Sequence, residues 1–411
     1  MWLQADPDSV KGYYKIWNEY AYCELKFIKV VKEGSNLLKS VYLADVNFHD
    51  PKMIGVVKKI LGQKRVFQKN DMQINLIYYR NNCLCLNDDK IKCYQNKIIK
   101  RYYRYNDILR VIINGEYDFA YIRYPFSDMK FIEFLKKIKS KHIPVIIEIP
   151  TYPYDGEVRG VKGRILHLLD KIYRKKLRSY VDYIVTYSDH REIFGIKCIN
   201  ISNGIDIDSI PIKKSKSIIQ NRFNLISVAN VSLWHGYDRV IRGLYEYYKM
   251  KNGLEVYFHI VGEGDQLQNL KRLTKDLGLE KYVIFHGVKT GSDLDDLFDG
   301  SHVAIGSLSM SRVGLSFGKT LKVREYCTRG IPFVIGYEDP DFPDSFKYIL
   351  KIPDDNTPVD INRIIDFFEN AIKNKDYQLE MRKFAEENLS WDVKFKPVID
   401  EIKRLIGDKT G

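Results

Sequence analysis

The alternation of short apolar runs with stretches of helical periodicity constrains the fold of this chain more than any other feature of its sequence. Apolar runs of strand length occur in the first half at 40–46, 71–80, 119–125 and 144–150. Segments such as 131–141, with apolar residues at helical spacing, lie between them. Strands that alternate with helices form parallel sheets joined by crossover helices.

A second series of the same kind starts at residue 224. Its strand candidates are 224–230, 256–262, 282–287, 302–307 and 331–336. The length of 411 residues is also more than one hydrophobic core usually serves. The sequence therefore predicts an α/β protein with two doubly wound, Rossmann-like domains. Ligands bind such sheets at the carboxyl ends of the strands, so we expect the functional site in a cleft between the domains.

Shifts in composition set the expected domain boundaries. We expect a helical N-terminal extension at 1–38 and a first α/β domain at 39–205. Residues 206–223 are rich in turn formers and lysine and are interpreted as a linker. The second α/β domain is expected at 224–390, and residues 391–407 form one amphipathic helix.

The charge balance restricts the partners. A net charge of +13 suits a phosphorylated substrate, an anionic membrane surface or a nucleic acid. Zinc-finger spacing, a basic region with heptads and RNA-reading aromatic motifs are all absent from the sequence, so no nucleic acid is expected. No apolar run reaches the roughly 20 residues that span a bilayer, and the first residues do not read as a secretory signal. We therefore expect a cytoplasmic protein.

The six cysteines do not suggest a metal site. Cys83 and Cys85 are too close in sequence to share a zinc site comfortably, and no His/Cys pair follows at finger spacing. We expect reduced thiols and no bound metal.

Two motifs in the second series suit a nucleotide. In VGEGDQLQNL, Gly262 and Gly264 follow a strand and open a helix, where the backbone can approach a diphosphate; a purely structural turn is the alternative. In LKVREYCTRG, Lys322 and Glu325 share one helix face. Glu325 would accept hydrogen bonds from a ribose diol and Lys322 would meet a phosphate, unless the two form a salt bridge on a solvated helix.

The order of the pieces is more specific than any one of them. SNGID (202–206) is followed by SVANVSLWHGYDRVIRGL, HIVGEGDQLQNLKRL, VIFHGVKTGSDLDDLF and LKVREYCTRGIPFV. With these pieces the sequence resembles the nucleotide-sugar-dependent glycosyltransferases of the GT-B fold, specifically the large retaining family 4, over roughly 40–407. WHGYDR, EIPTYPYD and KVREY look like a subgroup common in bacterial surface-polysaccharide synthesis. The resemblance also implies that helix 391–407 returns to the first domain.

Departures from the family pattern affect the donor site. The family places an Arg and a Lys after the first C-terminal strand, where this chain has Asn230 and His235. Glu325 matches the second, ribose-binding glutamate of the family's pair, but Phe317 stands at the place of the first. Lys322, with Arg312 or Arg239, would then supply the charge for the diphosphate. The expected donor-binding residues are Glu325, Lys322, Arg324, Asn230, His235, Gly236, Arg239, Gly262, Gly264, Val288 and Arg312.

Loops after the strands of the first domain supply the other candidates. The catalytic candidates are Glu148, His49 and Asp128. Glu148 would orient the acceptor or be a buried acid tied to the backbone, and His49 has a structural alternative. The family's histidine loop falls near 150–157 and has no histidine here. The expected acceptor-side residues are Tyr124, Tyr152, Tyr154 and Asp155.

Residues 161–178 combine a basic face with an apolar stripe of Ile165, Leu168, Leu169 and Ile172. Basic amphipathic helices lie on anionic membranes. The alternative is a domain helix whose apolar stripe packs on its own sheet.

The sequence thus predicts a metal-independent glycosyltransferase without a cofactor. It would move a sugar from a nucleotide-sugar donor to a saccharide acceptor, lipid-linked and at the inner membrane face, in surface-polysaccharide synthesis. The resemblance implies retention of the anomeric configuration. An inactive GT-B binding module and a nucleotide-sugar epimerase are the alternatives.

Overall fold

The computed structural model describes most of the chain, namely residues 37–50, 53–155, 160–214, 221–250 and 253–407. The expected extension at 1–38 therefore lies almost entirely outside the described residues. Contacts divide the chain into a first unit, residues 1–202 with 394–411, and a second unit, residues 203–393. A cleft between the two units stays a prediction.

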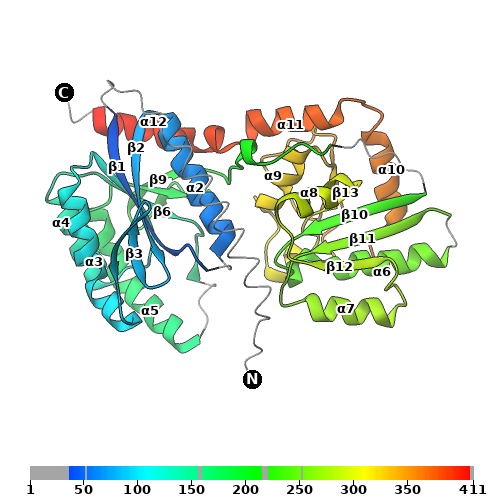
Figure 1. Cartoon of the computed structure of the whole chain (residues 1–411), viewed down its shortest axis with the longest axis horizontal. Coiled ribbons are helices and arrows are strands. Elements are labelled where there is room, and N and C mark those ends of the chain that lie inside the picture. Colours follow the sequence, from blue (N-terminus) through cyan, green and yellow to red (C-terminus); the bar gives the residue numbers. More distant parts are fainter. Residues whose placement is uncertain (1–36, 51–52, 156–159, 215–220, 251–252, 408–411) are drawn as a thin grey trace. The chain divides into compact units, whose positions relative to one another are not determined.

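The first unit is built on a sheet of nine strands within the described residues, in the order β4-β3-β2-β1-β5-β6-β7-β9-β8 (Figure 1). Its strands are β1 (Leu38–Asn47), β2 (Met72–Arg80), β3 (Cys83–Leu86), β4 (Asp89–Cys93), β5 (Phe119–Arg123), β6 (Val145–Ile149), β7 (Tyr183–Thr186), β8 (Glu192–Ile193) and β9 (Ile196–Asn200). The central pairs are parallel, and β3, β4 and β8 add antiparallel pairs at the edges. The carboxyl ends of the parallel strands therefore share one edge of the sheet.

Helices cover both faces of this sheet. They are α2 (Ile54–Lys69), α3 (Lys97–Asn114), α4 (Met129–Lys139), α5 (Gly160–Tyr173) and α12 (Trp391–Gly407). On one face, α3, α4 and the 3-10 turn Arg174–Ser179 after α5 bury apolar residues in a common core. On the other face, Phe67 of α2 and Phe395 of α12 pack on each other and on Tyr121. Residues 394–411 thus group with the first unit.

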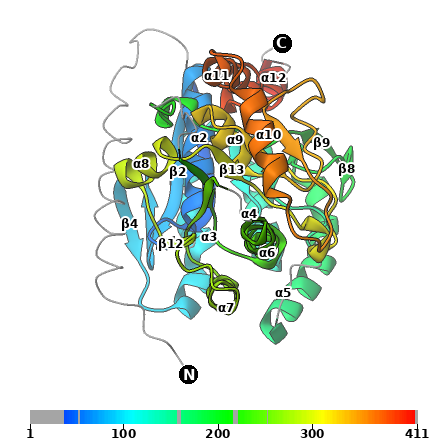
Figure 2. The same cartoon turned by 90° about the vertical axis from the view of Figure 1, so that its right-hand side faces the viewer.

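The second unit has a fully parallel sheet of six strands within the described residues, in the order β12-β11-β10-β13-β14-β15. The strands are β10 (Arg222–Val228), β11 (Glu255–Val261), β12 (Val283–Gly287), β13 (Val303–Ile305), β14 (Phe333–Ile335) and β15 (Ile349–Lys351). The helices are α6 (Tyr237–Lys249), α7 (Leu267–Asp276), α8 (Gly291–Asp299), α9 (Leu321–Arg329), α10 (Ile361–Ala371) and α11 (Tyr377–Asn388). α6, α7 and α10 bury apolar residues on one face, and α8, α9 and α11 on the other. Figure 2 shows α6 above α7 within the unit.

The expected linker is part of the second unit. Arg382 of α11 donates hydrogen bonds to the main-chain oxygens of Ile207 and Ile210. The ammonium of Lys213 donates to the main-chain oxygen of Asp299. The described part of 206–223 is therefore held on the domain that it was expected to precede.

The expectation of reduced thiols is wrong at one place. Cys83 of β3 and Cys93 of β4 form a disulfide. The two residues are direct partners in the antiparallel pair of strands, so the hairpin brings together cysteines that their spacing in sequence did not pair. Cys85, Cys198 and Cys327 are free thiols, and Cys23 lies outside the described residues.

Across the described ranges, no helix has both the length and the apolar character needed to cross a bilayer.

Candidate functional site

Two loops of the second unit pack tightly against each other at the carboxyl ends of β10 and β11. A Cβ atom added to Gly262 would lie 1.9 Å from the main-chain oxygen of Ala229, and one on Gly264 would lie 2.1 Å from that of Val231. Both glycines also have positive φ, at 124° and 159°. These positions require glycine because of backbone packing. This contact explains the two glycines by structure alone, while a role beside a diphosphate stays a prediction.

The next loop, from Asn230 to Gly236, leads into α6. Asn230 is exposed, whereas His235 is buried and its Nδ1 accepts a hydrogen bond from the main-chain N–H of Ser232. Burial, with the nearby charge of Lys322, lowers the pKa of His235 to about 2. His235 is therefore a neutral imidazole at physiological pH, so it does not supply the positive charge of the family's lysine. Gly236 has φ 65°, and an added Cβ would lie 2.5 Å from Ser309 Oγ.

The segment after β13 completes this end of the sheet. The main-chain N–H groups of Leu308 and Ser309 donate to the oxygens of His235 and Trp234. The hydroxyls of Ser307 and Ser309 are buried without a hydrogen-bond partner in the described part of the chain. Buried hydroxyls are normally satisfied, so these two are exceptions within the described residues.

Lys322 supplies the charge at this end. It lies in the first turn of α9, and its Nζ is 3.4 Å from the hydroxyl of Tyr237 at the start of α6. Protein encloses the amine although part of the side chain reaches the surface, and this burial lowers its pKa to about 7. No carboxylate of the described residues pairs with it. An enclosed cation without a counter-ion, close to the amino ends of α6 and α9, favours an anionic ligand such as a diphosphate.

Glu325 lies one turn after Lys322 but does not pair with it. Its Oε1 accepts hydrogen bonds from Arg329, which also contacts Asp295. The side chain is partly exposed, and Oε2 has no partner within the described residues, so one oxygen can accept from a ribose hydroxyl. Val288 follows β12 and is exposed. The donor roles of Glu325 and Val288 stay predictions.

Three arginines expected at the donor site are held elsewhere. Arg239 is buried and donates to the main-chain oxygens of Thr357, Leu308 and Pro353 and to Asp355. Arg324 is buried in ion pairs with Asp339 and Asp341. Arg312 makes a bidentate pair with Asp238. These contacts satisfy the guanidinium groups inside the unit and give all three a structural role, while their roles at the donor site stay predictions.

In the first unit, Glu148 is not at an open strand end. Its side chain is 0% exposed and faces α2, where it accepts hydrogen bonds from Gln63, Tyr121 and Arg123 at 2.7 to 2.8 Å. The Nζ of Lys59 lies 3.5 Å away. Burial alone would raise the pKa of Glu148, but Lys59, Arg123 and the hydrogen bonds lower it. Glu148 is therefore a buried acid paired with Lys59 and Arg123, which gives it a structural role, and a catalytic role stays a prediction.

The acceptor-side tyrosines do come together. Asp170 of α5 is buried and accepts hydrogen bonds from the hydroxyls of Tyr124 and Tyr154 and from the main-chain N–H of Ser127. Tyr152 packs edge-on to Tyr154, and Asp155 lies 2.8 Å from His167. The loops after β5 and β6 are thus held on α5, with an aromatic surface beside them.

The other two catalytic candidates have local roles. Asp128 is the N-cap of α4, where its Oδ1 accepts from the N–H of Phe131, as aspartate commonly does at a helix start. This contact gives Asp128 a structural role, and its catalytic role stays a prediction. His49 follows β1, is partly buried, and has a pKa lowered by burial and by Arg80 and Lys90. Its role stays a prediction.

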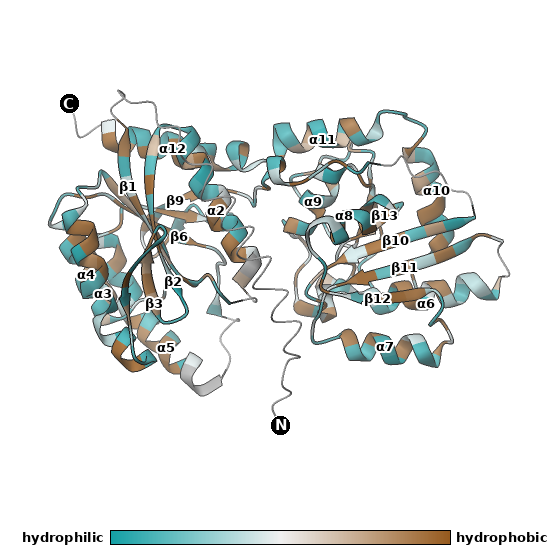
Figure 3. Cartoon of the chain, in the orientation of Figure 1, coloured by the Kyte–Doolittle hydropathy of each residue, from teal (hydrophilic) through white to brown (hydrophobic). Residues whose placement is uncertain are grey.

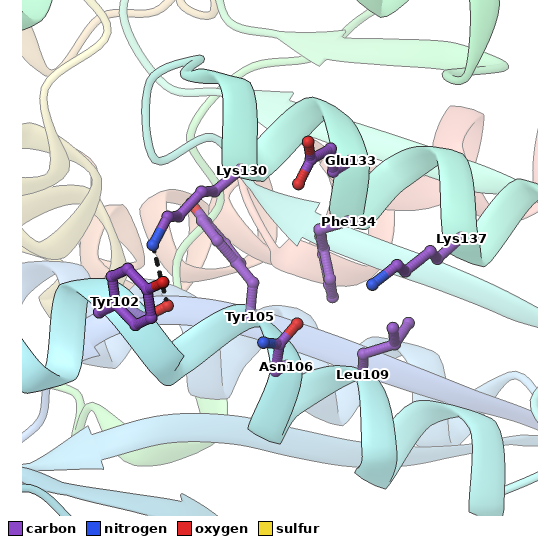
Figure 4. Close-up of a pocket in the computed structure, with 8 residues that line it drawn as sticks. All are labelled: Tyr102, Tyr105, Asn106, Leu109, Lys130, Glu133, Phe134 and Lys137. Atoms are coloured by element: carbon purple, nitrogen blue, oxygen red, sulfur yellow. Dashed lines mark hydrogen bonds between the residues drawn. The ribbon is translucent and has the colours of Figure 1, made fainter.

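A pocket of the first unit lies away from the strand ends. Figure 4 shows it between α3 and α4, with Tyr102, Lys130 and Lys137 among its lining residues. Groups of three or more His, Cys, Asp or Glu able to hold a metal do not occur among the described residues.

Sequence reasoning missed several residues of these sites. Asp170, Lys59 and Tyr237 were not singled out, because each acts through a partner far away in sequence. An acid inside the otherwise basic and apolar segment 161–178 was the available signal for Asp170. Nothing in the sequence marked Ser307 and Ser309.

Comparisons with known proteins agree with this arrangement. Residues 208–347 match the family model for "Glycosyl transferases group 1". The match supports the resemblance to group 1 glycosyl transferases for this region, and the surface-polysaccharide subgroup stays a prediction. No curated protein sequence matches the chain.

Solved structures show the same fold. A glycosyltransferase from Rickettsia africae has a TM-score of 0.61 and 13% identity, with 90% of this chain and 99% of that one covered. Anabaena HepE in complex with UDP has a TM-score of 0.56 and 14% identity, with 91% and 99% covered. The catalytic domain of Arabidopsis thaliana starch synthase IV, bound to ADP and acarbose, has a TM-score of 0.61 and 11% identity, with 91% and 100% covered. These likenesses confirm the expected fold of two α/β domains of the GT-B type.

Proposed function

We propose that the chain transfers a sugar from a nucleoside diphosphate sugar, bound by the second unit, to a saccharide acceptor bound by the first. The enclosed, unpaired amine of Lys322 is the observation that carries this proposal. It stands in the domain that matches the group 1 glycosyl transferases, and two neighbours in fold bind UDP and ADP.

The chemistry needs little more than positioning and charge. As the glycosidic bond to the donor breaks, negative charge grows on the departing diphosphate. Lys322 and the amide groups at the amino ends of α6 and α9 would stabilise that charge in an enclosed place, where such interactions are strong. Since these groups belong to the protein, we propose transfer without a metal, with retention as the resemblance implies.

The finer part of the proposal concerns the acceptor. We propose a lipid-linked saccharide in bacterial surface-polysaccharide synthesis, met at the inner face of the membrane. The subgroup resemblance and the net charge of +13 support this choice. The half-buried aromatic ring of Tyr152 beside the strand ends suits the apolar face of a sugar.

A thermal-shift screen against UDP, GDP, dTDP and ADP tests the donor site first. A ligand at about 100 times its dissociation constant adds about 2.7 kcal/mol of stability. Lys322→Met should lose the shift, whereas Lys275→Met, which removes an exposed lysine of the same unit, should keep it. A full shift in Lys322→Met would refute the role of Lys322.

Product analysis with the best donor then separates the alternatives. A modified acceptor supports transfer. An isomerised sugar without acceptor modification would indicate an epimerase, and the absence of any nucleotide binding would indicate an inactive module. Full activity after treatment with a chelator is expected, and loss of activity would contradict metal independence.

A further inference from the structure

Helix α5 packs with its polar face inward. His167, Asp170 and Arg174 recur at spacings of three and four, so they share one face, and their side chains are 12%, 0% and 18% exposed. Ile165, Leu168 and Ile172 share another face by the same spacing and are 56%, 62% and 57% exposed. The alternative in which the apolar stripe packs on its own sheet is therefore excluded for these residues.

Polar contacts explain this orientation. Asp170 accepts hydrogen bonds from Tyr124 and Tyr154, and Arg174 lies 3.5 Å from both Asp170 and Asp155. Turning the helix would move Asp170 outward and leave the buried hydroxyl of Tyr154 without its acceptor, which is costly. The apolar stripe is thus held outward by the network on the opposite face.

Two further apolar side chains in this part of the first unit are exposed. Leu166 is 39% exposed, and Phe126, from the loop after β5, is 41% exposed and packs edge-on to Tyr154. Figure 3 shows the apolar colouring along α5. Contiguous exposed apolar surface rimmed by polar residues marks an interaction site.

The rim of this surface is positively charged. The exposed ionic residues of 163–179 are all basic, namely Arg164, Lys171, Lys175, Lys176 and Arg178. Asp170 is the sole acid in this segment and is buried. An apolar stripe flanked by cations complements an anionic bilayer surface, where the stripe enters the interface and the cations meet the headgroups.

We propose that α5 docks the protein on an anionic lipid surface through Ile165, Leu168 and Ile172. This inference rests on the proposed function, because it names the element that brings the enzyme to a lipid-linked acceptor. The network around Asp170 links the docked helix to the loops after β5 and β6, so these acceptor-side loops are held on the helix that contacts the lipid.

Sedimentation of the full-length protein with vesicles tests the proposal. Vesicles of phosphatidylcholine alone are compared with vesicles that also contain phosphatidylglycerol, at low and high salt. The triple variant Ile165→Ser, Leu168→Ser, Ile172→Ser should lower binding to anionic vesicles by at least about tenfold. Met250→Ser with Leu379→Ser, which removes exposed apolar residues of the second unit, is the matched control and should bind like wild type.

Reversing the charge of the basic residues on α5 and the following turn tests the proposal independently. Lys171→Glu, Lys175→Glu and Lys176→Glu should remove the preference for anionic vesicles, and the wild-type preference should weaken as salt rises. Arg174 is left intact, since it belongs to the inner network.

Nucleotide thermal shift and transfer to a soluble acceptor are measured on every variant. Loss of vesicle binding with both readouts unchanged supports the proposal. Undiminished vesicle binding in the α5 variants would overturn it, as would equal, negligible binding of wild type to both vesicle types. Failure of nucleotide binding in wild type would instead refute the proposed function. A wild-type dimer that the triple variant dissociates, without vesicle binding, would assign the stripe to a second copy of the chain.

Discussion

Glu148 in the first unit and Lys322 in the second are both ionisable groups enclosed by protein, but their surroundings are opposite. Glu148 has two cations and several hydrogen-bond donors around it. Lys322 has a tyrosine hydroxyl at 3.4 Å and no carboxylate among the described residues. A buried charge that the fold neutralises serves the fold, whereas one left without a counter-ion marks a place for a ligand.

Of these predictions, replacement of Glu148, whose charge is balanced by cations, should have the largest effect on the free energy of unfolding. Glu148→Ala leaves Lys59 and Arg123 buried without their acid, so we expect a loss of about 3 to 5 kcal/mol in the free energy of unfolding. Urea titration followed by circular dichroism measures this loss. Because the pKa of Glu148 is lowered, its contribution should disappear as the pH falls below 4.5. A change under about 0.5 kcal/mol, typical of a surface site, would break the comparison.

Replacement of Lys322, whose charge is unpaired within the described residues, should affect ligand binding rather than the stability of the unliganded protein. Lys322→Met removes an enclosed cation without a counter-ion, so the unliganded protein should keep or gain stability. Binding of the nucleoside diphosphate should weaken by about 1.5 to 3 kcal/mol, while binding of the nucleoside alone changes little. Calorimetric titration with both ligands measures the difference, and an equal loss for the two would show that the lysine acts through the fold.

Glu325 lies between these extremes, since Arg329 already occupies one of its oxygens. If the other oxygen holds the ribose, Glu325→Ala should weaken nucleotide binding by about 1.5 kcal/mol. Deoxyribonucleotides should bind the variant and wild type with a smaller difference. Unchanged nucleotide affinity in the folded variant would remove Glu325 from the site.

The smallest effect concerns pH. Burial lowers the pKa of Lys322 to about 7, and a bound diphosphate would raise it again. Binding above pH 7 must therefore take up a proton, and the affinity should fall by up to about tenfold between pH 7 and pH 9. Titrations in buffers of different ionisation enthalpy report the proton uptake. The same pH dependence in Lys322→Met would assign the proton to another group.

Sequence patterns located residues at the ends of the strands, but not the contacts that these residues make. Lys322, Gly236 and Glu325 stand in local motifs whose places in a strand–loop–helix unit are readable from the chain. Arg239 pairs with Asp355, and Arg324 pairs with Asp339. Glu148 pairs with Lys59. Local sequence patterns do not reveal these ion pairs, because the partners are distant in sequence. A pattern therefore located charged residues, but not the contacts that decide whether they are free.

Two helices separate what the sequence determined from what the tertiary structure decided. The patterns of α5 and α12 each predicted an amphipathic helix, and both helices are present. In α12, Phe395, Val398 and Ile402 are fully buried, because α2 and the sheet offer aromatic rings such as those of Phe67 and Tyr121. In α5 the buried residue is Asp170, because the hydroxyls of Tyr124 and Tyr154 donate hydrogen bonds to it and Arg174 forms an ion pair with it. Periodicity along the chain fixes which residues share a face, but which face is buried depends on the partners that the rest of the fold presents to it.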